Sequence, residues 1–171
     1  RQRLLEQDPD TGLYRLALTM HELGASVQAT TDLHTAASPV LDQLRNMTKE
    51  TIQVAVLDGR HVVYIERRES PQTIRLFGRV GHRNHAYCTS TGKVLLANLP
   101  PYELDTTLTG WKLQKHTPYT IADLATLRSH LVQVRTQGWA ENVNEFEVGV
   151  ASLAAPIRDH RGTVVAAVSV A

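Results

Sequence analysis

A run of hydroxyl residues directly ahead of an apolar segment is the first place in this sequence that could do chemistry. The run is Thr89-Ser90-Thr91, followed by Gly92 and the apolar residues 94–97. Hydroxyl side chains before an apolar run predict a capped helix start, and the free N–H groups at such a start attract anions. Gly92 would let a ligand approach the backbone closely. The glycine spacing is not that of a phosphate loop, so the run indicates either a plain helix cap or a site for a small anion.

Polar residues also interrupt two otherwise apolar strands near the end of the chain. Ser152 lies within residues 150–154, and Ser169 lies between two valines. A hydroxyl that is buried in a sheet needs a hydrogen-bond partner, which is either the backbone or a small polar ligand. Asn142 and Asn144, near a predicted strand end, are either loop residues or ligand contacts by the same argument.

Cys88 lies close in sequence to His82 and His85, and such residues can form a thiolate pair or a zinc site. Their spacing here matches no specific ligand pattern. We therefore expect no metal, no cofactor and no catalysis at these residues. The alternative is an enzyme that uses Cys88 as a reactive thiol, and its mark would be unusually fast alkylation near neutral pH.

The first part of the chain predicts a hairpin and two helices. Residues 1–17 carry a turn rich in Asp, Pro and Gly between alternating flanks, which is typical of a small hairpin. A second helix is expected over residues 32–47, with Asp32 as its N-cap and Pro39 kinking or breaking it. Helical spacing predicts one apolar stripe on the first helix, formed by Leu16, Met20, Leu23 and Val27. In the second helix the residues expected to face inward are Val40, Leu41 and Leu44.

From residue 51 the apolar period changes to two, which predicts strands. Residues 51–57 and 62–65 flank an Asp-Gly pair, a strong signal for a hairpin. Residues 72–77 are expected to form a third strand and residues 78–85 a loop. Two last strands are expected over residues 150–157 and 163–171.

A further helix lies between these groups of strands. It is expected to begin at a capping box formed by Thr120-Ile121-Ala122-Asp123 and to end at Gly138. The order of helices and strands predicts an α+β fold, in which helices pack on a mostly antiparallel sheet. The predicted inner stripe of this helix consists of Ile121, Leu124, Leu127, Leu131 and Val134.

Composition narrows the class of protein. The 171 residues carry a net charge of +1, which argues against a strongly basic nucleic-acid binder. No apolar run is long enough to span a membrane. A single cysteine excludes an internal disulfide and fits the reducing cytoplasm. The chain begins at Arg1 without Met, so we expect a fragment of a longer protein whose DNA-binding element, if it has one, lies outside it.

Several separate blocks of the sequence resemble the IclR family of bacterial transcription regulators. Residues 85–97 resemble the family stretch P-x-H-A-T-A-x-G-K-A-x-L-A. The blocks around Tyr119, Gly138 and Gly149 resemble its second part, and residues 154–157 and 166–170 resemble its close. Differences occur inside the first block: His85 stands where proline is usual, and Ser90 where alanine is usual.

This resemblance implies a GAF-like (profilin-like) effector domain joined by a linker helix to a winged helix-turn-helix. Residues 1–17 would be the end of the winged domain, residues 18–30 the linker helix and residues 31–171 the effector-binding domain. The family also implies a homodimer or tetramer that binds operator DNA through the missing N-terminal part.

The resemblance also implies which residues form the effector site. The helix start contributes Thr89, Ser90 and Thr91, and the remaining positions come from the strands and loops around it. We expect a ligand-sensing domain, not an enzyme, that binds a small organic acid or an aromatic metabolite; a permanently empty dimerisation module is a third possibility. The other implied site residues are Thr73, Leu76, Asn84, Asn142, Val150, Ser152 and Ser169.

Overall fold

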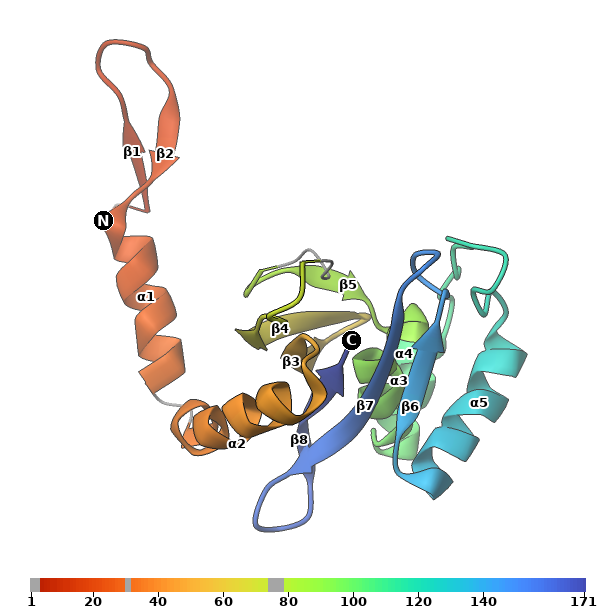
Figure 1. Ribbon diagram of the computed structural model, residues 1–171. Helices are drawn as coiled ribbons and strands as arrows, with labels where there is room; N and C mark the ends of the chain where they lie inside the picture. Colours follow the sequence, from red (N-terminus) through yellow and green to blue (C-terminus); the bar gives the residue numbers. More distant parts are fainter. Residues whose placement is uncertain (1–3, 30–31, 74–78) are drawn as a thin grey trace. The chain divides into compact units, whose positions relative to one another are not determined.

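The computed structural model describes residues 4–29, 32–73 and 79–171. The chain divides into two compact units, residues 1–40 and 41–171. Of the predicted strand over residues 72–77, residues 72 and 73 form a bend, and residues 74–77 lie outside the described residues. Figure 1 shows the order of the elements along the chain.

The first unit begins with the predicted hairpin. Strands β1 (Leu5–Gln7) and β2 (Tyr14–Leu16) pair antiparallel, with Leu5 opposite Leu16. The carboxylate of Asp8 accepts the amide of Thr11 at 2.8 Å, which closes the turn. Helix α1 (Leu18–Ala29) follows directly. Leu16 therefore belongs to β2 and not to the helical stripe, because strand pairing extends to this residue.

Helix α2 (Asp32–Thr48) forms with Pro39 inside it and without a break. Leu41 is buried and Leu44 half-buried, as predicted, whereas Val40 is 61% exposed. Val40 was wrongly assigned to the inner face because it lies about 100° around the helix from Leu41. The predicted cap position at Asp32 is the first residue of the helix itself.

The second unit is built on one six-stranded antiparallel sheet in the order β5-β4-β3-β8-β7-β6. The predicted hairpin around Gly59 joins β3 and β4 (Figure 1), and Gly59 has the positive φ of 59° that this tight turn requires. Part of the predicted loop over residues 78–85 is a three-residue edge strand, too short to show a period in the sequence. The strands are β3 (Ile52–Asp58), β4 (His61–Arg68), β5 (Arg83–His85), β6 (Ala140–Val143), β7 (Ala151–Arg158) and β8 (Val164–Val170).

A bulge in β4 changes the face of the sheet on which the side chains after it lie. Tyr64 lies opposite Ala55, but Glu66 lies opposite Val54, so β4 carries one extra residue at this point. Tyr64 faces the main core, whereas the carboxylate of Glu66 accepts a 2.8 Å hydrogen bond from Arg68, which also donates to Asp42 on α2 at 2.7 Å. Without the bulge, residues 64, 66 and 68 would share one face.

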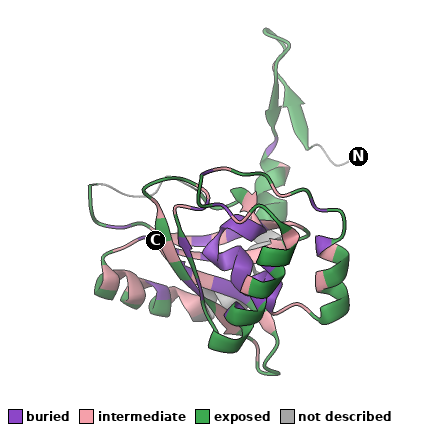
Figure 2. Ribbon diagram, turned by 90° about the vertical axis from the view of Figure 1, so that its right-hand side faces the viewer, coloured by how far each residue is buried: buried purple, intermediate pink, exposed green. Residues whose placement is uncertain are grey.

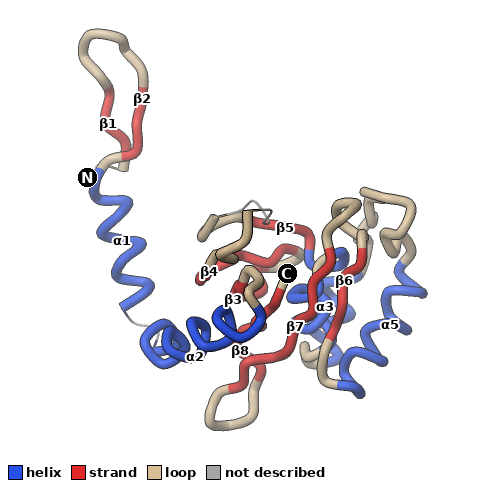
Figure 3. Tube along the Cα trace, viewed as in Figure 1, coloured by secondary structure: helices blue, strands red, loops and turns tan. Residues whose placement is uncertain are grey.

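Helix α3 (Ser90–Ala97) is the centre of the core. It follows the short 3₁₀ helix η1 (Ala86–Cys88), and all of its residues are buried (Figure 2). It packs on the face of the sheet formed by β7, β8 and β3, and it also contacts α5 (Leu124–Gln137). Figure 3 shows the helices and strands of this unit along the chain trace. Helix α4 (Pro101–Leu108) connects them in sequence.

Helix α5 begins later than the capping box predicted. Its N-cap is Asp123, whose carboxylate accepts the amide of Thr126 at 2.8 Å. The hydroxyl of Thr120 instead donates to the carbonyl of Glu145 at 2.6 Å. Because this tertiary contact engages the hydroxyl, Thr120 does not cap the helix as predicted. The helix ends at Gly138 in the left-handed conformation, as predicted, and its buried residues are Leu127, Leu131 and Val134.

Candidate functional site

The site begins at the front of α3. The hydroxyl of Thr89, the N-cap, accepts the amide of Gly92 at 3.2 Å, and the carbonyl of Thr89 accepts the amide of Lys93 at 3.0 Å. The amides of Ser90 and Thr91 belong to the first helical turn and have no acceptor within the helix. The helix dipole adds partial positive charge at the same point. This helix start can therefore attract a small anion.

Gly92 has a different role from the one expected. A Cβ atom at this position would lie 2.2 Å from the carbonyl oxygen of Ala86 and 2.3 Å from its Cα. The glycine thus lets α3 pack directly on the backbone of η1. The close approach at Gly92 is made by the protein itself.

A cavity of about 260 Å³ lies in front of this helix start. The hydroxyls of Ser90 on α3 and Ser152 on β7 are 2.7 Å apart. The helix and the sheet therefore meet through their polar side chains at the cavity. The residues that line it are Gln53, Tyr64, His82, Asn84, Thr89, Ser90, Asn142, Phe146, Glu147, Val150, Ser152, Ser169 and Ala171.

Strand register brings the polar side chains of the sheet together. Asn142 on β6 lies opposite Ser152 on β7, and Gln53 on β3 lies opposite Ser169 on β8. Paired residues of an antiparallel ladder have their side chains on the same face. These four residues, which are scattered in the sequence, therefore form one polar surface facing α3.

Most of the residues implied by the family resemblance line this cavity. Thr91 does not line it, although it is buried next to the phenol of Tyr64. Thr73 is exposed and lies outside the lining, and Leu76 is outside the described residues. The seven that line the cavity are Asn84, Thr89, Ser90, Asn142, Val150, Ser152 and Ser169.

Sequence reasoning missed six lining residues. Gln53 stands between Ile52 and Val54, both fully buried, and carries the same signal that singled out Ser152: a polar residue inside an apolar strand. Tyr64 looked like an ordinary strand aromatic. His82 was considered only as a possible partner of Cys88. Nothing in the sequence indicated the remaining three, which come from a loop and from the last residue: Phe146, Glu147 and Ala171.

The lining is polar but almost uncharged. Among the described residues that form it, Glu147 is the only Asp, Glu, Lys or Arg. Burial raises the pKa of the Tyr64 phenol, and the nearby polar side chains of Thr91 and Asn84 offset part of that rise. The phenol therefore stays protonated at neutral pH. The described lining residues therefore offer hydrogen-bonding groups and the helix start, and they include no Lys or Arg.

A buried ion pair holds α3 against the loop that closes the cavity. The ammonium of Lys93, which is fully buried, lies 2.5 Å from the carboxylate of Glu145. The amide of Glu145 donates to the side-chain oxygen of Asn142 at 2.9 Å. Burial raises the pKa of Glu145, and the charge of Lys93 acts against this rise. The pair thus links the helix that carries Ser90 to the segment that carries Asn142 and Phe146.

Cys88 does not have the properties of a reactive thiol. It is fully buried, and burial, together with the nearby charge of Glu145, raises its pKa to about 12. A nucleophilic cysteine needs the opposite shift, because the thiolate is the reactive form. Within the described residues, no three His, Cys, Asp or Glu side chains are arranged to hold a metal ion.

Comparisons with known proteins identify the class to which this fold and cavity belong. The family profile described as bacterial transcriptional regulator IclR C-terminal matches residues 25–171. The transcriptional regulator XynR of Escherichia coli (strain K12) is 37% identical over 165 residues, which cover 96% of this chain and 66% of XynR. The chain therefore spans just under two thirds of the length of this relative.

Solved structures agree with this result. A transcriptional regulator of Rhodococcus sp. RHA1 superposes with a TM-score of 0.85 at 36% identity, covering 92% of this chain and 64% of that one. The inducer-binding domain of PobR from Acinetobacter, a double mutant in complex with 3-hydroxybenzoic acid, gives a TM-score of 0.73 at 31% identity, with 80% of each chain covered.

The fold is that of the C-terminal domains of IclR-family regulators. The chain belongs to the IclR family of bacterial transcriptional regulators, and it contains the effector-binding domain of that family. The proteins it resembles are regulators and not enzymes, which agrees with the buried, protonated state of Cys88. No helix in the described part of the chain is long and apolar enough to cross a membrane.

Proposed function

We propose that the cavity in front of α3 binds a small organic acid. The carboxylate of the ligand accepts hydrogen bonds from the amides of Ser90 and Thr91, where the helix dipole favours negative charge. The observation that carries this proposal is the contact of the Ser90 and Ser152 hydroxyls at 2.7 Å within one cavity. Both hydroxyls can turn toward a ligand that enters between α3 and β7.

The lining favours a hydroxylated acid over an aromatic one. Asn142, Ser152, Gln53 and Ser169 offer neutral donors and acceptors along the sheet side, and Phe146 is the only Phe or Trp among the described lining residues. A buried polar group that a ligand leaves without a partner costs free energy. The cavity volume of about 260 Å³ lies at the small end for ligand sites. We therefore infer a compact ligand with several hydroxyl or carbonyl groups.

The domain would act as the sensor of a DNA-binding regulator in the cytoplasm. In this proposal residues 1–17 end a winged helix-turn-helix, residues 18–30 form a linker helix and residues 31–171 sense the effector. Two or four copies would bind operator DNA through the N-terminal domains. The effector changes DNA binding only if it prefers one arrangement of the subunits, and a coupling of about 1–3 kcal/mol is enough for regulation.

A pair of neighbouring substitutions tests the proposed site. Ser152→Phe places a large ring in the cavity, whereas Leu153→Phe, at a position that is 51% exposed, alters the neighbouring residue outside the cavity lining. Gluconate, glycerate, lactate and 3-hydroxybenzoate would be titrated calorimetrically against both variants and the unmodified chain. We expect saturable binding of a hydroxylated acid that Leu153→Phe retains and Ser152→Phe weakens at least about tenfold, a loss of 1.4 kcal/mol. Unchanged binding to Ser152→Phe, or no binding of any acid, would contradict the proposal.

A further inference from the structure

A second cavity, of about 440 Å³, lies next to the first and is lined mainly by histidines. His82, Asn84 and Phe146 line both cavities, so the two share a wall. We call the second one the histidine cavity. Its other lining residues are His61, Arg83, His85 and His116.

Three elements bring the imidazoles together. His61 on β4 lies opposite His85 on β5, and their ring centroids are 4.8 Å apart. The ring of His116, from the segment between α4 and α5, lies 5.7 Å from that of His85. Nδ1 of His85 and Nε2 of His116 are buried and have no hydrogen-bond partner among the described residues. A buried polar atom without a partner is uncommon in folded proteins and needs an explanation.

One acidic residue, Asp58, lies opposite His61 in the hairpin of β3 and β4, outside the lining of the histidine cavity. No Asp or Glu belongs to the described residues that line the histidine cavity. The carboxylate of Asp58 pairs with Arg83 at 2.7 Å, and Glu147 lines only the first cavity. The aromatic neighbours, Tyr87 and Phe146, carry no charge there.

The environment of His85 disfavours its protonated form. Burial lowers the pKa of His85, and the neighbouring His61 and His116 lower it further. His85 is therefore mostly neutral near pH 7. A negative charge placed between the rings would reverse this balance, because it favours the protonated form of each imidazole.

We propose that the histidine cavity is a second ligand site, which receives an oxyanion group, a carboxylate or a phosphate, and takes up a proton as that group binds. Protonated His85 and His116 would donate the hydrogen bonds that their ring nitrogens now lack. The proton comes from solvent and remains on an imidazole, and no covalent bond changes. The group is either a second anionic group of the ligand in the first cavity or a separate small anion.

The test follows the protonation of individual histidines by NMR of their ring carbons. The whole 171-residue chain would be titrated from pH 5 to pH 8.5 in sodium chloride, sodium sulfate and disodium glutarate at equal ionic strength. His85→Asn and His160→Asn identify the two resonances. His160, exposed on the turn between β7 and β8, reports any general effect of the salts.

We expect sulfate or glutarate to raise the titration midpoint of His85 by about one pH unit, the size of shift that a nearby opposite charge produces. The midpoint of His160 should not move. His116→Gln removes one of the two proposed donors and should reduce the shift at His85. Equal midpoints for His85 in all three salts would overturn the proposal, whether or not the first cavity binds an acid.

Ser152→Phe separates the two sources of the anion. If sulfate shifts His85 equally in Ser152→Phe and the unmodified chain, the histidine cavity binds a separate anion. If only glutarate acts, and Ser152→Phe abolishes its effect, the cavity receives the second carboxylate of a ligand held in the first cavity. Both results support an oxyanion site. A sulfate shift that His116→Gln leaves intact would contradict the proposed arrangement.

Discussion

The two neighbouring cavities represent two different ways to receive a negative charge. The cavity in front of α3 uses backbone amides and neutral side chains, such as Ser90 and Ser152, that donate at any pH near neutrality. The histidine cavity uses imidazoles, and burial and mutual repulsion keep the charge off His85. In the proposed scheme, the first cavity can bind an anion without a change of protonation, whereas the histidine cavity must gain a proton. Anion binding at these two neighbouring cavities should therefore differ in its dependence on pH.

Removing the support behind both cavities should have the largest effect. Lys93→Met leaves the Glu145 carboxylate buried without its cation, and Glu145 precedes Phe146, which lines both cavities. Breaking a buried pair in this way costs about 3–5 kcal/mol of unfolding free energy, measurable by urea denaturation. Lys93→Met combined with Glu145→Leu should recover part of that loss. A single variant as stable as the unmodified chain would show that the pair does not hold the loop.

Gly92→Ala should destabilise the packing of α3 against η1. Its added Cβ meets the backbone of Ala86, so η1 or α3 must move, and α3 carries Ser90. Overpacking of this kind costs about 1–3 kcal/mol. The control is Gly24→Ala in α1, where nothing lies within 4 Å of the new Cβ, and where alanine should stabilise the helix by up to about 1 kcal/mol. Thermal unfolding of both variants checks this, and a neutral Gly92→Ala would contradict the close packing.

The histidine cavity should make stability depend on pH through His85. The unfolded chain binds the proton at this residue with the ordinary pKa of 6.5, and the folded chain binds it less tightly. The unfolded state then holds more protons between the lowered folded pKa and 6.5, so stability falls as the pH drops through that window.

His85→Asn should therefore lose less stability than the unmodified chain between pH 7 and pH 5. The difference should be below about 1 kcal/mol, because solvent screens a partly exposed group. Denaturant unfolding at several pH values measures it, with His160→Asn as the matched control. Parallel pH profiles for His85→Asn and the unmodified chain would argue against repulsion within the cluster.

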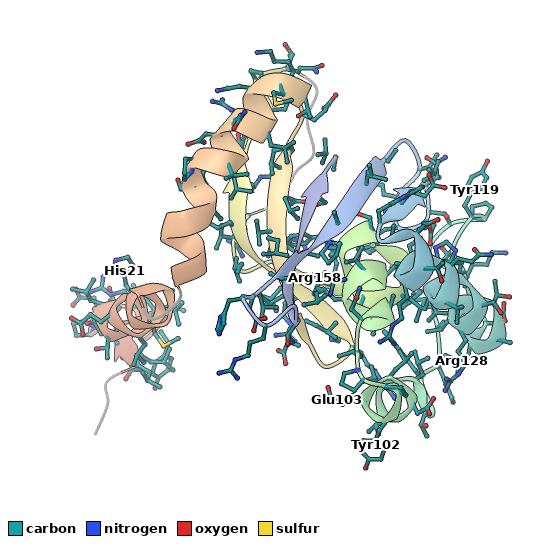
Figure 4. The ribbon with its side chains drawn as sticks, turned by 90° about the horizontal axis from the view of Figure 1, so that it is seen from below. His21, Tyr102, Glu103, Tyr119, Arg128 and Arg158 are labelled. Atoms are coloured by element: carbon teal, nitrogen blue, oxygen red, sulfur yellow. The ribbon has the colours of Figure 1, made fainter. Side chains whose placement is uncertain are left out.

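The smallest effect is expected at an ion pair far from both linings. Arg128 on α5, labelled in Figure 4, lies 2.6 Å from Asp105 on α4, and the two side chains are 46% and 63% exposed. Arg128→Gln should change the unfolding free energy by less than about 0.5 kcal/mol. It should leave ligand binding and the His85 titration unchanged. A change in either would mean that the outer helices also control the cavities.

Features with local causes were predictable from the sequence. The hairpin at Gly59, the start of α3 at Thr89, the end of α5 at Gly138 and most of α2 follow from turn residues, caps and period. The same signals identified Ser90, Ser152 and Ser169 as hydroxyls in need of partners. Each of these features depends on residues within a few positions of one another in the chain.

The features that were predicted wrongly depend on residues that lie far apart in the sequence or on contacts with other elements. Thr120 does not cap α5, because its hydroxyl donates a hydrogen bond to the carbonyl of Glu145, 25 positions away. We expected Gly92 to let a ligand approach the backbone. Glycine is instead needed because a Cβ atom at this position would clash with the backbone of Ala86. The bulge in β4 decided that Tyr64 and Arg68 lie on different faces. None of these relations leaves a periodic trace in the sequence.

The amino-acid sequence by itself determined the family, the α+β architecture and the hydroxyls at the front of α3, because propensity, capping and alternation act over short stretches of chain. Only the tertiary structure decided which polar residues face one another. Strand register set Gln53 opposite Ser169, and pairing at the sheet edge set His61 opposite His85. Register depends on how the whole core packs, since a slip of one residue turns every side chain of a strand to the other face.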